Sequence, residues 1–318
     1  MNASQRPEVL FAAGYHLRCK PLCDGRVKMD SFELKAVAFE ADGKGHAEFL
    51  AGKYDAGEFS LANYLALKSR GEPLMAIPVF PNRKFRHSYI FVREDSPLKE
   101  PVQLKGKRVG IPSWLNTCGL WVRGILSDEY GVKAQDIHWI ARRKTPLELS
   151  LPVRTQLETV PGEESLPDRL LKGEIDAIIV PDFPHENGVR RLFADSKAVE
   201  QDFYRRTRIF PTSHAVTFHK AYLDKHPSAA VEMFNACYKA KKLALEDDAD
   251  ATYSNFAWVR HTWEEQRAVL GPDPWKYGIK GNEKVLNTLI HYADEQGLLQ
   301  RKISIEDLFV QIDEPEKP

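Results

Sequence analysis

The sequence has little of what marks a disulfide-rich or membrane-spanning protein. Its 318 residues include only four cysteines, which have neither the density of a disulfide scaffold nor the CxxC spacing of a zinc or redox site. We expect reduced thiols; a Cys19–Cys23 disulfide, which would need a tightly curled chain, is the alternative. No segment approaches the roughly 18 consecutive apolar residues of a transmembrane helix, so we expect none.

An excess of charge and an export signal are also lacking. The 45 basic and 45 acidic residues balance, which argues against a nucleic-acid or membrane-surface partner, since both favour a basic excess. The N-terminal MNASQRPEVLFAAGY has neither the basic start nor the apolar stretch of a secretory signal. We therefore expect a cytoplasmic protein; the processed form of an exported protein is the alternative. GxGxxG, Walker A, HExxH and GxSxG strings are absent, so no dinucleotide or phosphate cofactor is indicated.

What the sequence does contain is an alternation of short apolar strands with segments of helical length. The candidate strands are 9–13, 34–39, 75–79, 89–92, 108–111 and 177–180. Such alternation is typical of an α/β protein with mostly parallel sheets. From Asp224 onward the pattern becomes helical, so we expect a helical C-terminal region.

Two extended, proline-containing segments, 92–110 and 206–220, look like crossings between two lobes. They predict a clamshell in which lobe one is discontinuous, formed by residues 1–95 and 208–318, while residues 96–207 form lobe two. A ligand would then bind in the cleft between the lobes.

Several strings resemble the 4,5-dihydroxyphthalate decarboxylase family over nearly the whole chain. They include GKYDAGEFSLANYLALKSRG, IPVFPNRKFRHSYIFV, KGEIDAIIVPDFP and IFPTSHAV, and FPNRKFRHS is the most particular of them. The resemblance implies a two-lobed, type II periplasmic-binding-protein-like clamshell. It also implies decarboxylation, without metal or organic cofactor, of a hydroxylated aromatic dicarboxylic acid to a dihydroxybenzoate and CO2. After DIHW the chain departs from the family pattern with bulky, charged residues, among them Arg142 and Arg143, which leaves the exact acid open.

An aromatic diacid brings two carboxylates into a cleft, and arginine pairs best with such groups. Arg83, Arg86 and His87 precede the strand at 88–92, in a turn that begins with proline. A solvated basic loop is the alternative interpretation, but the family resemblance favours Arg86 and His87 as cleft residues, and Arg83 less clearly.

Two helix starts supply further candidates. Ser60 is a favoured N-cap residue, and the helix after it offers unpaired N–H groups to an anion. Glu58, two residues earlier, is a candidate acceptor for a substrate hydroxyl, with a capping or ion-pairing carboxylate as the alternative. Asn116 and Thr117 begin a second helix and could bind a carboxylate as well as cap it. Arg123 points to roughly the opposite side from Asn116 and ranks lower.

The second crossing contributes Ser213 and His214. His214 is interpreted as a cleft residue that moves a proton, with a buried, hydrogen-bonded histidine as the alternative. His214 and His219 are five residues apart in an extended segment and so face opposite ways, which argues against a metal site.

These residues suggest a mechanism for the implied reaction. Glu58 would contact the ring hydroxyls, His87 or His214 would donate a proton, and Arg86 with Asn116 and Thr117 would hold the carboxylates. The competing hypothesis is a solute-binding protein that holds an aromatic or sulfonated acid for an ABC transporter, because fold alone does not define function. A cytoplasmic ligand-sensing domain is a third interpretation. The expected partner is a small aromatic acid. The sequence does not decide whether the chain forms a homo-oligomer.

Overall fold

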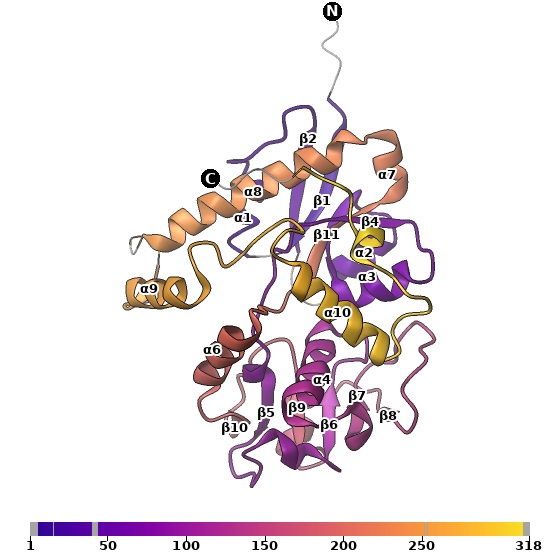
Figure 1. Cartoon of the computed structure of the whole chain (residues 1–318), viewed down its shortest axis with the longest axis vertical. Helices are drawn as coiled ribbons and strands as arrows, with labels where there is room; N and C mark the ends of the chain where they lie inside the picture. Colours follow the sequence, from indigo (N-terminus) through magenta and orange to yellow (C-terminus); the bar gives the residue numbers. More distant parts are fainter. Residues whose placement is uncertain (1–5, 15, 40–43, 251, 253, 314–318) are drawn as a thin grey trace, which may run out of the picture.

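The computed structural model describes residues 6–14, 16–39, 44–250, 252 and 254–313. Two β-sheets, each with helices around it, lie one above the other (Figure 1). This arrangement confirms the α/β class, and the predicted helical C-terminal region is present as well. In the described part of the chain no helix is both long and apolar enough to cross a membrane.

Sheet one forms lobe one and has the order β2-β1-β3-β11-β4. Its strands are β1 (Glu8–Gly14), β2 (Glu33–Phe39), β3 (Ala56–Ser60), β4 (Leu74–Ile77) and β11 (His214–His219). β1 pairs in parallel with β2 and β3, whereas β11 runs antiparallel to β3 and β4. All five residues of β3 are buried, because the central strand of a covered sheet faces protein on both sides.

Sheet two forms lobe two and has the order β10-β5-β9-β6-β7-β8. Its strands are β5 (Ile90–Arg93), β6 (Arg108–Ile111), β7 (His138–Ala141), β8 (Gln156–Thr159), β9 (Ala177–Ile179) and β10 (Val189–Arg191). β9, β6, β7 and β8 are parallel, and β5 runs antiparallel to β9 and β10.

The helices of the N-terminal two thirds are mostly short connections between strands. They are α1 (Lys20–Cys23), α2 (Lys44–Leu50), α3 (Leu61–Lys68), η1 (His87–Tyr89), η2 (Pro101–Leu104), α4 (Thr117–Tyr130), η3 (Ala134–Asp136), α5 (Leu166–Leu171), α6 (Ser196–Thr207) and α7 (Lys220–Lys225). Among them α4 is well capped. The Asn116 side chain accepts from the Gly119 N–H, and Gly131 ends the helix in the left-handed region at φ 61°.

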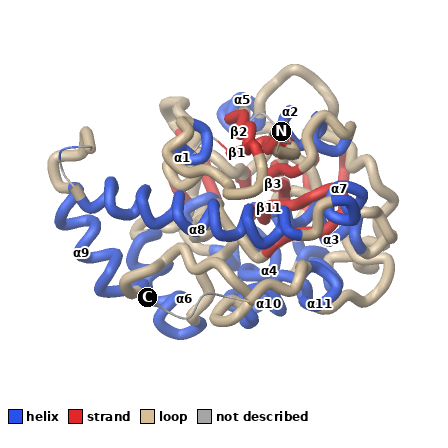
Figure 2. The backbone as a smooth tube through the Cα atoms, turned by 90° about the horizontal axis from the view of Figure 1, so that it is seen from above, coloured by secondary structure: helices blue, strands red, loops and turns tan. Residues whose placement is uncertain are grey.

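The C-terminal helices cover lobe one and reach lobe two. They are α8 (Ser228–Ala249), α9 (Val259–Leu270), α10 (Glu283–Glu295) and α11 (Ile305–Leu308). Seen from above, α8 runs across lobe one with α9 beside its far end (Figure 2). α10 packs against α4 so closely that a Cβ on Gly124 would lie 2.2 Å from the Tyr292 ring. One apolar core therefore continues through both lobes, from Phe59 to Leu120 and Leu289.

The first crossing differs from the expected position. The chain leaves sheet one after β4, and β5 already belongs to sheet two, so the boundary lies before residue 90 and not at 95. The charged segment at 93–107 is a connection within lobe two, since it contains η2 and joins β5 to β6 of the same sheet. The sequence of a short apolar strand such as β5 does not indicate which of the two sheets the strand joins.

The two segments that connect the lobes, residues 82–86 and 211–214, pair with each other. The Ser213 N–H donates to the Asn82 carbonyl at 2.8 Å, and the Lys84 N–H donates to the Pro211 carbonyl at 3.1 Å. Arg83 and Thr212 form an antiparallel bridge between these bonds. The hinge is thus a short two-stranded ribbon that fixes residues 82–86 beside residues 211–214.

Candidate active site

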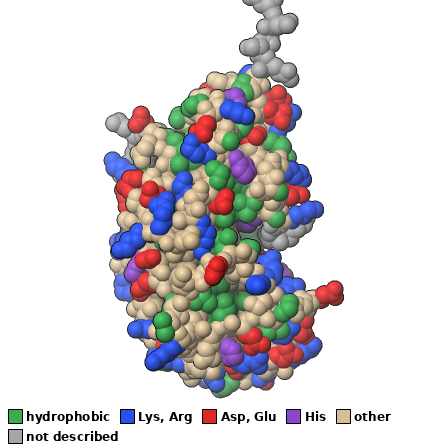
Figure 3. All heavy atoms as spheres, turned by 90° about the vertical axis from the view of Figure 1, so that its right-hand side faces the viewer, with side chains coloured by type: hydrophobic (Ala, Val, Ile, Leu, Met, Phe, Trp, Pro, Cys, Tyr) green, Lys and Arg blue, Asp and Glu red, His purple; other side chains and the backbone are tan. Residues whose placement is uncertain are grey.

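The candidate site lies where the carboxyl ends of parallel strands from both sheets meet, the usual location of ligand sites in open α/β sheets. β1 and β3 of sheet one end there, and β6 of sheet two leads into Asn116. β11 runs the opposite way, so its first residue, His214, lies at the same edge and pairs with Ser60. The surface is hollowed between the lobes (Figure 3).

Glu58 is the centre of this site. Its side chain is 1% exposed, and both carboxylate oxygens are occupied. Oε2 is 2.7 Å from His16 Nε2 and accepts from the Gly14 N–H at 3.1 Å, while Oε1 is 2.6 Å from His214 Nδ1. Burial alone would raise the Glu58 pKa, but the bonds and charges of His16 and His214 outweigh burial and hold that pKa well below its usual value. Glu58 is therefore an ionised carboxylate that accepts a hydrogen bond from each histidine.

This geometry changes the role expected for Glu58. Both oxygens already accept hydrogen bonds within the protein and the side chain is 1% exposed, which favours the ion-pairing alternative over contact with a ligand hydroxyl. Glu58 instead orients His214, because an Nδ1–H bonded to a carboxylate fixes the ring and leaves Nε2 for another partner. The His214 side chain is 22% exposed and is therefore accessible to a ligand.

Replacing Glu58 with glutamine should lower stability in a pH-dependent way. Removing one partner of a buried charged cluster costs about 3–5 kcal/mol in the free energy of unfolding. The folded-state pKa of Glu58 is depressed, so its contribution is present above the unfolded-state pKa of about 4.3 and is lost as the pH falls through the folded-state pKa. Urea unfolding of wild type and Glu58→Gln should show an equal difference in unfolding free energy at pH 7.5 and 5, both above about 4.3, and a smaller difference at pH 3.

Glu48→Gln is the matched control. Glu48 is a solvent-facing carboxylate paired with Lys53, so its replacement should have a small effect at pH 7.5. A Glu58→Gln gap that is the same at all three pH values would contradict the ionised state of Glu58.

Two further histidines, which the sequence analysis did not single out, also belong to this site. His16 follows β1 and bonds to Glu58, and His46 lies in α2, after β2. The His46 ring lies edge-on to His214, with 5.1 Å between ring centroids. Burial, the largest influence, lowers the His46 pKa to about 4, so this ring is neutral at pH 7. Their positions in the sequence could have indicated them, because each histidine follows the carboxyl end of a parallel strand.

Arg86 and Ser213 come from the two segments that connect the lobes, 82–86 and 211–214. Arg86 is buried, and its Nη2 donates to Ser213 Oγ. Arg86 Nε and Nη1 are buried and have no hydrogen-bond partner among the described residues. A buried guanidinium with two unused donor groups suits a carboxylate ligand.

Ser60 and Thr117 meet across the two lobes. Their hydroxyl oxygens are 2.9 Å apart, and Thr117 Oγ1 also accepts from the Ala62 N–H at 3.1 Å. The N-termini of α3 and α4 therefore face each other, which places two sets of N–H donors at the same part of the cleft. Asn116 caps α4, as the sequence predicted for one of its two compatible roles.

Arg83 and Arg123 are used within the protein. Arg83 donates to the Phe210 carbonyl at 3.0 Å and to Asn282 Oδ1 at 2.5 Å. Arg123 donates to Gln296 Oε1 at 2.6 Å and to the Trp114 carbonyl at 2.8 Å. Arg83 thus stabilises the hinge and Arg123 the contact between lobes.

His87 lies away from the glutamate and its histidines. Its ring packs against Phe193 and Phe203, with centroid distances of 5.6 and 5.1 Å, and both ring nitrogens are buried without a partner in the described chain. Burial lowers the His87 pKa to about 4. The structure does not bring His87 to Glu58 and His214. Arg142 and Arg143, which follow β7, are exposed.

One set of residues has the composition of a metal site. Donor atoms of His16, Cys19 and Glu58 all lie within 4.8 Å of one another. The His16 and Glu58 donors, however, are 2.7 Å apart in a direct hydrogen bond, whereas two ligands that are each about 2.0–2.2 Å from a tetrahedral zinc ion lie farther apart. In this structure His16 and Glu58 therefore bond to each other and are too close together to be two ligands of one zinc ion.

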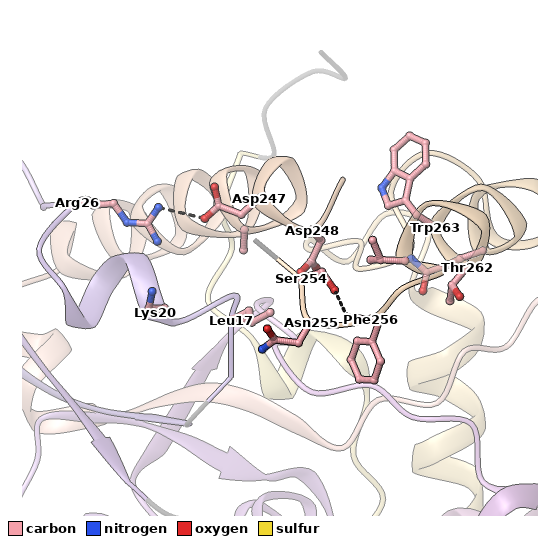
Figure 4. Close-up of a pocket in the computed structure, with 13 residues that line it drawn as sticks. Leu17, Lys20, Arg26, Asp247, Asp248, Ser254, Asn255, Phe256, Thr262 and Trp263 are labelled. Atoms are coloured by element: carbon pink, nitrogen blue, oxygen red, sulfur yellow. Dashed lines mark hydrogen bonds and ion pairs between the residues drawn. The ribbon is translucent and has the colours of Figure 1, made fainter. Parts of the chain in front are cut away.

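A separate groove of about 560 Å³ lies between α1, α8 and α9 (Figure 4). Leu17, Phe256 and Trp263 line it, and the ion pair between Arg26 and Asp247 lies at its edge, with a distance of 3.1 Å. None of the lining residues comes from the cluster around Glu58, so the groove is not part of the candidate active site.

Comparison with known proteins places the chain among both enzymes and binding proteins. A family profile described as "ABC transporter, phosphonate, periplasmic substrate-binding protein" matches residues 43–232. The 4,5-dihydroxyphthalate decarboxylase of Comamonas testosteroni is 32% identical over 316 residues, covering 95% of this chain and 96% of that protein. The enzyme of the same name from Pseudomonas putida is 34% identical over 207 residues, covering 61% and 80%.

Solved structures support the same fold at low sequence identity. The periplasmic aliphatic sulphonate binding protein SsuA from Escherichia coli matches with a TM-score of 0.57 and 14% identity, covering 98% of this chain and 94% of that one. The desulfurization enzyme DSZB matches with a TM-score of 0.52 and 12% identity, covering 95% of each chain. The predicted periplasmic-binding-protein-like clamshell is thereby confirmed.

Proposed function

Because the chain belongs to the 4,5-dihydroxyphthalate decarboxylase family, we propose that it is a carboxy-lyase that converts a hydroxylated aromatic dicarboxylic acid such as 4,5-dihydroxyphthalate to a dihydroxybenzoate and CO2. The observation that carries this proposal is the ionised, buried Glu58 bonded to His214 Nδ1. A site that only binds an acid needs donors for its carboxylates. A carboxylate that orients a histidine serves proton transfer.

The reaction exchanges a carboxyl group for a proton. His214, protonated on both ring nitrogens, donates from Nε2 to the ring carbon that bears the departing carboxylate. The positive charge on His214 is stabilised beforehand by Glu58, 2.6 Å from Nδ1. The carbon–carbon bond then breaks, its electron pair returns to the ring, and CO2 leaves. Solvent reprotonates His214, so one proton is consumed for each CO2 released.

The carboxylates need fixed donors during this step. Arg86, with Nε and Nη1 unused, would bind one carboxylate together with Ser213. Asn116 and Thr117 at the start of α4 would face the other. A hydroxyl para to the departing carboxylate would raise electron density at the carbon to be protonated. Every group in this scheme is a side chain or helix end of the protein itself.

The proposal predicts turnover that can be followed directly. Purified protein incubated with 4,5-dihydroxyphthalate should release CO2 and one equivalent of dihydroxybenzoate. In D2O the product should carry one deuterium, at the carbon that lost its carboxyl group, because the proton comes from an exchangeable histidine. Chromatography with mass detection measures both quantities.

The alternative is a solute-binding protein, which the matched family profile and the SsuA fold favour. The same experiment separates the two functions. Tight binding of hydroxylated phthalates without CO2 release from any of them would support the binding protein and reject the decarboxylase.

A further inference from the structure

The proposed mechanism assigns Glu58 to His214 and names no partner for the ring hydroxyls of the substrate. His46 is available for this task. Resting on the proposed function, we propose that His46 Nε2 accepts a hydrogen bond from a ring hydroxyl of the substrate and so selects hydroxylated aromatic acids.

The position of His46 in the fold supports this role. It lies in α2, which follows the carboxyl end of β2, and β2 is parallel to β1, whose own carboxyl end leads to His16. Its ring is perpendicular to that of His214, at 5.1 Å between centroids. The proton donor and the proposed hydroxyl acceptor are therefore in direct contact.

The His46 ring is held in place by its surroundings. It packs edge-on against Phe59 at 5.3 Å, Phe39 at 5.6 Å and His214 at 5.1 Å between ring centroids. These three ring contacts fix the position of the ring, and with it the direction of Nε2. A fixed acceptor discriminates between ligands better than a mobile one.

The Nε2 atom of His46 is buried and has no hydrogen-bond partner among the described residues. A buried polar atom left unsatisfied costs about 1–3 kcal/mol, and most such atoms in native proteins find a partner. The ring is neutral at pH 7, since burial lowers its pKa to about 4, and a neutral ring with one protonated nitrogen has an acceptor on the other. A phenolic hydroxyl supplies the missing donor.

His46→Phe tests the proposal because phenylalanine keeps the ring packing and removes the nitrogen. Binding of two ligands that are not turned over, 3,4-dihydroxybenzoate and benzoate, can be measured by calorimetry. A neutral hydrogen bond contributes about 0.5–1.5 kcal/mol, so His46→Phe should weaken 3,4-dihydroxybenzoate binding by about 2- to 12-fold. Benzoate binding should stay within about twofold of wild type, since benzoate has no hydroxyl.

His46→Gln and His226→Phe complete the experiment. Glutamine restores a polar group and should recover part of the lost affinity for 3,4-dihydroxybenzoate. His226, which packs on Phe32 and Tyr222 away from the site, is the matched histidine control and should leave both affinities unchanged. Equal weakening of both ligands in His46→Phe, or no weakening, would overturn the proposal. A wild-type protein that shows the ligand preference but releases no CO2 would refute the decarboxylase and leave the role of His46 intact.

Discussion

Replacing His214 with glutamine is expected to lower kcat by about 10²- to 10⁴-fold, the usual contribution of a positioned proton-transfer group. Glutamine retains polarity and length but cannot carry an ionisable proton. The Kd for substrate should change little, because the carboxylates are held by other residues. Single-turnover CO2 release and equilibrium binding measure the two quantities separately.

The matched control for this variant is His219→Gln. His219 lies at the other end of β11 and bonds through Nε2 to the Phe49 carbonyl at 2.8 Å, away from Glu58. Its replacement should leave kcat near wild type. If His214→Gln keeps kcat within about threefold of wild type, the proton comes from another group and the proposed mechanism is wrong.

Replacing Arg86 with glutamine is expected to weaken substrate binding strongly. Hydrogen bonds to charged groups contribute about 1.5–3 kcal/mol, so the Kd for 4,5-dihydroxyphthalate should rise by about 10- to 150-fold. Arg86→Lys should recover only part of this affinity, because an ammonium group lacks the planar fork that matches a carboxylate. Fluorescence or calorimetric titration measures the effect.

Arg93→Gln serves as the control for Arg86. Arg93 ends β5 and pairs with the exposed Asp95 at 3.0 Å, so its loss should have little effect on the Kd. The diacid 4,5-dihydroxyphthalate should lose more affinity in Arg86→Gln than catechol, which has the hydroxyls but no carboxylate. Equal losses for the two ligands would show that Arg86 maintains the site without binding a carboxylate.

The two lobes of the clamshell share one apolar core, which restricts their movement relative to each other. Apolar packing continues from lobe one into lobe two. Gln296, which follows α10, accepts buried hydrogen bonds from Trp114 Nε1 and Arg123 Nε and so ties α10 to lobe two. Opening the cleft widely would expose this core, at roughly 25 cal/mol for each Å² of apolar surface. A site with fixed walls suits the positioning that proton transfer requires.

The sequence alone determined the features that depend on local chemistry. Apolar runs such as 9–13 and 108–111 form strands because β-branched and apolar residues suit a covered sheet, and Asn116 caps a helix because its side chain reaches a nearby N–H. The family resemblance, carried by strings spread over the whole chain, is likewise a property of sequence and is confirmed.

Only the tertiary structure decided which polar residues meet. Glu58 lies 42 residues from His16 and 156 from His214, and no local pattern reports such a contact. His87 and His214 both adjoin apolar strands, yet His87 packs among aromatic rings while His214 bonds to a buried carboxylate. The chemistry of a histidine depends on what surrounds it after folding, because burial and charged neighbours set its protonation and its direction. That is why the sequence indicated candidates, and the fold decided which of them lie together.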